Sequence, residues 1–265
     1  MTTNNQLTIK GFFYRDDVKA KFNELMGQRS AQFITSVLSI VNNNNYLKNA
    51  TPESVFSAAL MAATLDLPVN PNLGFAYIIP YGQQAQFQVG YKGLIQLALR
   101  SGQFKTISVS PVYEGQIKQQ NPLTGFEFDW ANKVSDKVVG YAAYFSLING
   151  FEKTHYMTTE EISAHGKRFS KTFGNGVWKS DYDAMACKTV LKLLLSKFAP
   201  LSIEMQKAVI ADQAIIKDAE TMDVDYVDAG ADVTEAKEKA AQDAMVRLNK
   251  LKTTTDELPK GGLIK

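Results

Sequence analysis

The sequence has few of the side chains that form disulfides or bind soft metal ions. Its 265 residues include one cysteine, Cys187, and two histidines. No disulfide can form within the chain, and a structural zinc site lacks ligands. No apolar run approaches the ~20 residues that cross a bilayer, and residues 1–17 carry no basic-then-apolar export signal. We therefore expect a cytoplasmic protein without a membrane partner.

Signatures of catalysis are also missing. A phosphate-binding loop needs G-x-x-x-x-G-K-[ST], but residues 174–180 place Trp178 where the second glycine must be. The patterns G-x-G-x-x-G and H-E-x-x-H do not occur. Asp181 and Asp183 could be the metal ligands of a nuclease, yet at the start of an expected helix carboxylates also cap free N–H groups. We predict no cofactor, no metal site and no covalent catalysis.

Charge is distributed unevenly along the chain. Residues 1–200 hold 20 Lys and Arg against 14 Asp and Glu, whereas residues 201–265 hold 9 against 13. Within residues 163–200, seven bases face two acids. A basic body followed by an acidic end indicates a polyanionic partner for the body, although a solvated surface would give the same counts.

The periodicity predicts an α+β fold in which a small antiparallel sheet packs on helices. Helical spacing precedes residue 68, and strand patterns occupy 75–89, 104–113 and 137–157. Asn149-Gly150 predicts a hairpin with a two-residue type I′ turn, in which both residues have positive φ. Helices are expected at 90–102, after a capping box at Thr158-Thr159-Glu160-Glu161, at 181–199 with Asp181 as the cap, and from the cap Ser202 to about Ala219. Residues 1–15 are expected to form an arm and 167–180 a loop. We predict a core at 1–220 and a flexible acidic linker with a helical tail at 221–265.

Two segments, 75–105 and 167–197, combine bases, aromatic residues and glycines. Binding of single strands without sequence preference needs this pairing, because bases neutralise phosphates and rings stack on nucleobases. Lys188 and Lys192 are four residues apart on one predicted helix and therefore share a face. If that face contacts phosphates, reversing both charges should weaken DNA binding without unfolding the protein. The alternative is that these lysines are merely solvated.

The same two segments resemble the sequence signatures of a known protein family. Residues 70–105 read NPNLGFAYIIPYGQQAQFQVGYKGLIQLALRSGQFK, and residues 178–200 read WKSDYDAMACKTVLKLLLSKFAP. In this order and at this separation, the two blocks resemble the signatures of the RecT family of phage and prophage single-strand annealing recombinases. The resemblance spans roughly residues 10–220 and weakens after Val224.

The resemblance implies an ATP-independent protein that binds single-stranded DNA and pairs it with a complementary strand. It also implies a homo-oligomer, as a ring or helical filament, that works beside a phage exonuclease and holds annealed duplex; host single-strand-binding protein is a further expected partner. Carried onto this chain, the family groove corresponds to Lys92, Arg100, Lys105, Lys179, Lys188 and Lys192. Charge and stacking add Tyr91, Arg168, Phe169, Lys171, Phe173 and Trp178.

Two alternatives stay open at this point. A passive single-strand-binding protein would coat DNA without annealing it, and sequence separates the two only through the family resemblance. A metal-dependent nuclease would cut labelled DNA in the presence of Mg²⁺.

Overall fold

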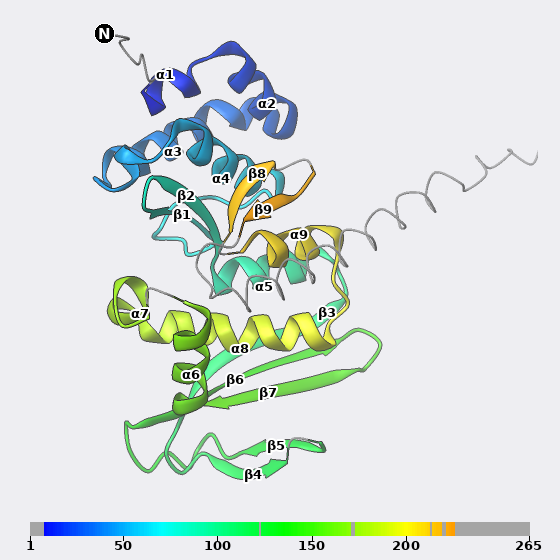
Figure 1. Ribbon diagram of the computed structural model, residues 1–265. Helices are drawn as coiled ribbons and strands as arrows, with labels where there is room; N and C mark the ends of the chain where they lie inside the picture. Colours follow the sequence, from blue (N-terminus) through cyan, green and yellow to red (C-terminus); the bar gives the residue numbers. More distant parts are fainter. Residues whose placement is uncertain (1–7, 122, 171–172, 213, 219–220, 226–265) are drawn as a thin grey trace, which may run out of the picture.

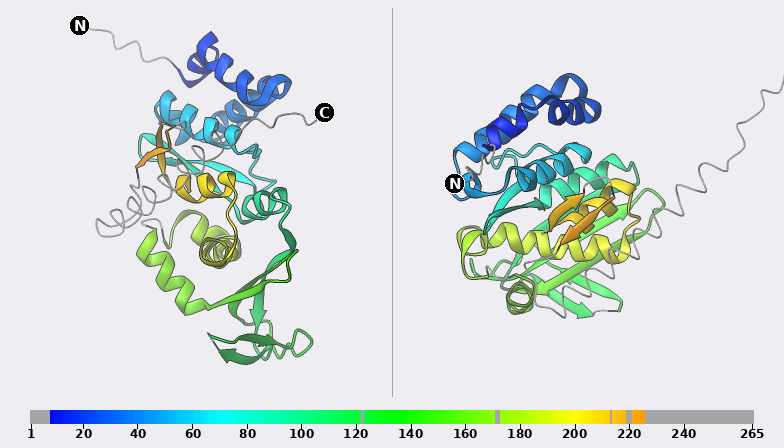
Figure 2. Two further views of the ribbon diagram at one scale, coloured as in Figure 1. Left: turned by 90° about the vertical axis from the view of Figure 1, so that its right-hand side faces the viewer. Right: turned by 45° about the horizontal axis from the view of Figure 1, so that its top comes forward.

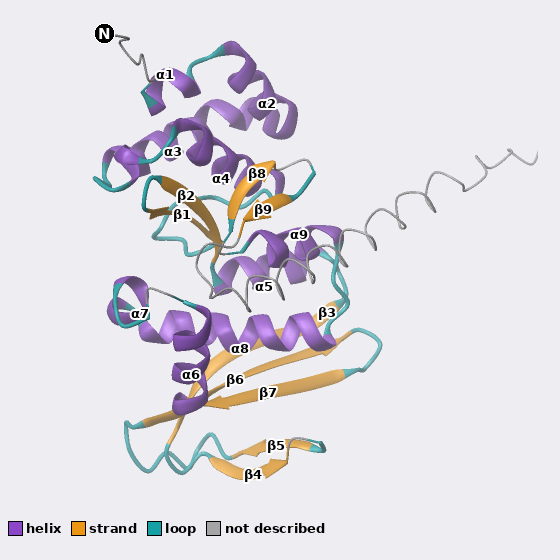
Figure 3. Ribbon diagram, in the orientation of Figure 1, coloured by secondary structure: helices purple, strands orange, loops and turns teal. Residues whose placement is uncertain are grey.

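Helices and antiparallel strands combine into an α+β fold in the computed structural model, which describes residues 8–121, 123–170, 173–212, 214–218 and 221–225 (Figures 1 and 3). The helices are α1 (Ile9–Phe13), α2 (Asp16–Met26), α3 (Ser30–Asn42), α4 (Pro52–Thr64), α5 (Tyr91–Arg100), α6 (Thr159–Phe169), α7 (Gly176–Ser180), α8 (Tyr182–Phe198) and α9 (Ile203–Ala211), with 3-10 turns η1 (Gly27–Arg29) and η2 (Leu47–Asn49). The strands are β1 (Ala76–Tyr81), β2 (Gln84–Val89), β3 (Phe104–Tyr113), β4 (Ile117–Asn121), β5 (Gly125–Phe128), β6 (Val138–Leu147), β7 (Glu152–Thr158), β8 (Ile215–Asp218) and β9 (Asp223–Asp225).

The molecule is elongated, with α1–α3 at one end and the β4–β5 hairpin at the other (Figures 1 and 2). The N-terminal helices pack through a cluster of phenylalanines, in which the ring of Phe22 lies 5.7 Å from those of Phe33 and Phe56. The expected arm at residues 1–15 is in part a helix, because Ile9, Phe12 and Phe13 are buried in this cluster and Thr8 caps α1.

A three-stranded antiparallel sheet in the order β3–β6–β7 forms the centre of the second half. A turn at Asn149-Gly150 joins β6 to β7 as predicted. Only Gly150 has a positive φ, of 87°, so the turn is not the predicted type I′, which needs a positive φ at both residues. Helix α8 covers one face of the sheet and separates it from the N-terminal half (Figure 1).

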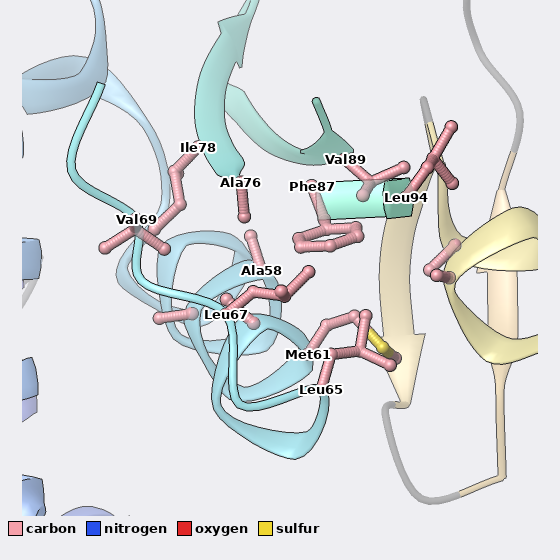
Figure 4. Packing of buried hydrophobic residues seen from close by; sticks show 14 of the residues in the cluster. Ala58, Met61, Leu65, Leu67, Val69, Ala76, Ile78, Phe87, Val89 and Leu94 are labelled. Carbon is pink, nitrogen blue, oxygen red and sulfur yellow. The ribbon is translucent and has the colours of Figure 1, made fainter. Parts of the chain in front are cut away.

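The β1–β2 hairpin packs on α4 and is extended by β8 through a bridge between Phe87 and Ala214. The sequence predicts its turn at Pro80-Tyr81-Gly82; the turn includes Gly82, whereas Pro80 and Tyr81 still pair with β2. Figure 4 shows Phe87 surrounded by core side chains of α4, of the segment that follows it and of α5: Ala58, Met61, Leu65, Leu67 and Leu94.

Sequence periodicity did not predict the β4–β5 hairpin. Its strands have four or five residues, and β4 is mostly polar, so no apolar alternation marks it. The hairpin covers a second, smaller cluster at the far face of the sheet, where Phe126 and Phe128 pack on Tyr156 with ring centroids 5.6 and 6.1 Å apart.

The C-terminal part differs from the expectation. Helix α9 begins at the predicted cap, Ser202, but ends at Ala211 instead of Ala219, since Ala214 and Ile216 are buried beside β2 and continue as strand β8. Strand β9 pairs with β8, and Met222 is 4% exposed, so the first residues of the expected acidic linker belong to the fold. The helical tail expected after the acidic linker lies outside the described residues.

Candidate nucleic-acid interface

The two sequence blocks meet where α5 and α8 begin. Tyr77 of β1 and Tyr91 of α5 are both near Asp181, which precedes α8. Burial raises the pKa of both phenols, and the negative charge of Asp181 raises it further. Residues more than 80 positions apart in the sequence are therefore brought together, and Figure 1 shows α5 and α8 running side by side at this point.

Glycines let the chain pack closely around the start of α5. A Cβ on Gly90 or Gly93 would lie 2.1 Å from the carbonyl oxygen of Gly74 or Phe75, respectively. No larger residue fits at either position, because the segment before β1 crosses directly over the first turn of α5. The side chain of Lys92 passes beside Gly74 and the Tyr77 hydroxyl, and Lys92 is exposed. A cation and two phenol rings therefore share this corner.

Helix α6 and the short α7 form the neighbouring wall. Thr158 and Glu161 make the predicted capping box of α6, which extends to Phe169, so the expected loop at 167–180 is only partly a loop. Arg168 is exposed, and its guanidinium lies 5.2 Å from the centre of the Phe169 ring. Lys179 of α7 is also exposed. Lys171 lies outside the described residues.

Trp178 does not present its ring to solvent. It is 7% exposed and packs between Phe173 and Tyr182, with ring centroids 5.2 and 5.7 Å away. Phe173 in turn packs against Gly166, where a Cβ would lie 2.5 Å from its ring. These two aromatic residues, expected to stack on bases, instead fix α7 against α6 and α8.

Lys188 and Lys192 share a face of α8, as their spacing predicted, but that face points into the fold. Lys188 Nζ lies 2.8 Å from Asp212 Oδ1 and Lys192 Nζ 2.5 Å from Asp212 Oδ2, and the three side chains are 7%, 24% and 0% exposed. Burial by itself would raise the pKa of Asp212, but the two ammonium groups outweigh it and lower the pKa to about 2.

This cluster changes how the lysines must be tested. Reversing both charges would place three carboxylates in one buried site, so loss of DNA binding would follow from loss of folding. In this conformation the two ammonium groups form ion pairs with Asp212. The sequence analysis did not identify Asp212 as their partner. Its only sequence signal was an acidic residue at the end of an apolar helix.

Arg100 and Lys105 lie away from this corner, beyond the other end of α5. The guanidinium of Arg100 donates to the carbonyl oxygens of Leu65 and Asp66, both at 2.7 Å, and so caps the C-terminal end of α4. Asp66 has a positive φ of 48° at this helix end and pairs with Arg29 at 2.7 Å. Lys105 is exposed on β3.

The carboxylates considered as metal ligands have partners within the fold. Asp181 caps α8 by accepting from the N–H of Ala184 at 3.1 Å, as expected, and Asp183 accepts a hydrogen bond from the phenol of Tyr141. Among the residues that the structure describes, no group of three His, Cys, Asp or Glu side chains could hold a metal ion. Cys187 is buried, and burial together with Asp183 and Asp181 raises the pKa of its thiol to about 11.

None of the helices in the described ranges is both long and apolar enough to cross a membrane. The fold and the site define an α+β protein in which exposed cations and half-buried phenol rings lie near the start of two adjacent helices, α5 and α8.

Comparison with known proteins places this architecture in a family. The model of the RecT family matches residues 31–225, and the chain belongs to the RecT family. It is 54% identical over 207 residues to the uncharacterized protein YqaK of Bacillus subtilis (strain 168), covering 77% of this chain and 72% of YqaK. It is 32% identical over 183 residues to protein RecT of Escherichia coli (strain K12), covering 63% of this chain and 65% of that protein. The family membership supports a role in DNA recombination by single-strand annealing.

Proposed function

We propose that the protein binds single-stranded DNA where α5 and α8 begin and anneals it to a complementary strand without ATP. The observation that carries this proposal is the convergence of the two RecT-like blocks, which brings Tyr77, Tyr91 and Lys92 next to the residues around Asp181. The family match, which spans both blocks, supplies the class of ligand.

The exposed cations at this place are the phosphate ligands in the proposal. Lys92 on α5, Arg168 on α6 and Lys179 on α7 are exposed. The packing of Trp178 on Phe173 and Tyr182 holds α7 against α6 and α8. Neutralising phosphates releases condensed counterions, so affinity falls as salt rises. Lys171 belongs to the same segment of sequence and is part of the proposed set. Arg100, Lys188 and Lys192 act within the fold, and Lys105 stays a separate candidate.

Annealing in this scheme needs no covalent chemistry. Base pairing supplies the free energy, whereas phosphate repulsion and the collapse of each strand on itself slow the encounter. A cationic surface that holds one strand extended lowers that barrier by screening the phosphates and leaving base edges free for a second strand. The protein would then hold the annealed duplex.

The partners in this proposal follow from the family. We propose a homo-oligomer, as a ring or a filament, that continues the binding surface from one copy to the next along the strand. An exonuclease that generates the single strand is the expected collaborator, and host single-strand-binding protein is a second one. A reducing cytoplasm suits a chain whose single cysteine is a buried free thiol.

A fluorescence annealing assay with two complementary oligonucleotides, without ATP or Mg²⁺, tests the proposal. The wild-type chain should pair the strands faster than they pair alone. A protein that binds each strand but leaves the rate unchanged is a passive coat, and strand scission in a parallel reaction with Mg²⁺ would reveal a nuclease.

The double variant Lys92→Glu/Lys179→Glu locates the site. Both side chains are exposed, so the variant should unfold at the wild-type temperature but bind and anneal DNA at least tenfold more weakly. The matched control is Lys10→Glu/Lys48→Glu, which makes the same change of charge at two other exposed positions, on α1 and η2. Equal losses in the two variants would mean that overall charge, not this site, governs binding.

A further inference from the structure

The β1–β2 hairpin has one apolar face and one face of a different chemistry. Antiparallel pairing sets Tyr77 opposite Gln88, Ile79 opposite Gln86 and Tyr81 opposite Gln84. Because side chains alternate along a strand, these six residues lie on one face. Their neighbours Ala76, Ile78, Ala85, Phe87 and Val89 are buried on the other face, which packs on α4. We call the first set the Tyr–Gln face.

The amide of Gln86 is buried on this face without a hydrogen-bond partner. Gln86 is 2% exposed, and its Nε2 atom meets no acceptor. A buried donor left without an acceptor costs about 1–3 kcal/mol. By contrast, the neighbouring Gln84 lies nearer the turn, and its Oε1 atom accepts from the hydroxyl of Thr51 at 3.3 Å. The Gln86 amide is therefore a donor for which the described fold supplies no partner.

Aromatic side chains flank this donor. Tyr77 and Tyr81 are half-buried, whereas Gln86 is buried and its Nε2 atom is covered, so a base reaches this amide only when the groups over it move. Four residues of strand separate the two tyrosines by about 13 Å. Flat rings beside amide groups are the chemistry that binds unpaired bases, through stacking on the ring and hydrogen bonds to the base edge.

The face adjoins the proposed phosphate ligands. The hydroxyl of Tyr77 and the side chain of Lys92 both lie against Gly74, since a Cβ there would be 3.3 Å from the Tyr77 oxygen and 3.4 Å from Lys92 Cδ. A strand whose phosphate is bound by Lys92 would thus have its next bases beside Tyr77.

We propose that the Tyr–Gln face is the subsite for unpaired nucleobases, in which Tyr77 stacks on a base and the Gln86 amide donates to a base oxygen or ring nitrogen. This inference rests on the proposed function and adds a base-contacting part to it. All four bases offer acceptors to such a donor, so the subsite tolerates any sequence. Part of the affinity for single strands then depends on bases and not on phosphates.

Substitution of Gln86 by methionine separates a ligand-binding role from a structural one. Methionine has similar volume and no donor, so Gln86→Met should leave the free protein as stable as the wild type or more stable. The probes are oligothymidylate and an abasic strand of the same length, titrated at one salt concentration by fluorescence anisotropy. We expect Gln86→Met to bind oligothymidylate five- to tenfold more weakly and the abasic strand with unchanged affinity. Gln83→Met, in the turn of the same hairpin, is the control and should bind both strands like the wild type.

The outcomes are distinct. Unchanged affinity of Gln86→Met for oligothymidylate overturns the inference, and so does an equal loss for both strands. A changed oligomer size in the absence of DNA also overturns it, because the face would then contact another copy. If Gln86→Met does not fold, the amide serves the fold, and Tyr77→Leu decides on base stacking by the same comparison of strands. Failure of the proposed function looks different, since the wild-type chain would then bind neither strand.

Discussion

Lys188 of α8 and Asp212, the residue after α9, form an ion pair of 2.8 Å inside the protein, where their side chains are 7% and 0% exposed. Asp212 also accepts from the backbone N–H of Val89 at 3.1 Å, and so joins α8, the end of α9 and strand β2. A feature that looks like a DNA-binding lysine in the sequence is thus a link between the two blocks that build the proposed site.

Replacing Asp212 by asparagine should destabilise the protein by about 3–5 kcal/mol, because the buried ammonium group of Lys188 would face a neutral amide in place of a carboxylate. Urea unfolding followed by circular dichroism measures the loss. Asp223→Asn, an exposed carboxylate of β9, should change the free energy of unfolding by less than about 0.5 kcal/mol. The double variant Lys188→Met/Asp212→Asn should recover most of the loss, since the buried charge is removed and the amide still accepts from Val89. If the double variant is no more stable than Asp212→Asn, the ion pair is not the source of the effect.

The same carboxylate makes stability depend on acid. The pKa of Asp212 is lowered to about 2 in the folded protein, whereas an aspartate in an unfolded chain titrates near ~3.9. Its stabilising contribution is therefore complete above about pH 4 and is lost as the pH falls towards 2. The difference in unfolding free energy between the wild type and Asp212→Asn should be constant at pH 5–7 and shrink below pH 4. A difference that stays constant down to pH 2.5 would contradict this assignment, and Asp223→Asn provides the comparison.

Local rules predicted the elements that local chemistry determines. The Asn149-Gly150 turn, the capping box at Thr158 and the N-caps at Asp181 and Ser202 all depend on residues within four positions, and all four are present. The end of α9 was predicted wrongly because residues 214–216 have apolar character that suits either a helix or a strand. The bridge from Ala214 to Phe87, more than 120 residues away, decides the outcome.

The candidate site shows the same limit. Charge and spacing correctly place Lys188 and Lys192 on one face, but a sequence does not reveal what lies opposite that face. The same limit applies to Arg100. Its guanidinium donates to the backbone carbonyls of Leu65 and Asp66, and a sequence pattern does not indicate which backbone carbonyls a side chain will reach. In contrast, Lys92 and Lys179 are exposed, as a cation that contacts DNA must be.

Arg100→Ala should lower stability by about 1–3 kcal/mol, because it removes two charge-assisted hydrogen bonds to the C-terminal end of α4. Arg100→Lys should restore little of the loss, since one ammonium group cannot reproduce the planar fork that reaches both carbonyls. Thermal unfolding of the three proteins measures the effect. DNA binding should then be measured at a temperature where all three proteins are folded. Wild-type affinity in Arg100→Ala assigns this residue to the fold, and a large loss of affinity with unchanged stability would return it to the DNA surface.

The salt dependence of binding tests whether Lys92 contacts a phosphate. For single strands, log affinity falls against log salt with a slope of about 0.7 per neutralised phosphate. Lys92→Gln should therefore weaken binding to oligothymidylate and reduce the magnitude of this slope by about 0.7, whereas Lys48→Gln, on the N-terminal part of the molecule, should leave the slope unchanged. Titrations at four or more salt concentrations measure both. The abasic strand should show the same reduction as oligothymidylate, because a phosphate contact does not depend on the base. A loss of affinity at an unchanged slope would mean that Lys92 acts through the packing around Gly74 and not through charge.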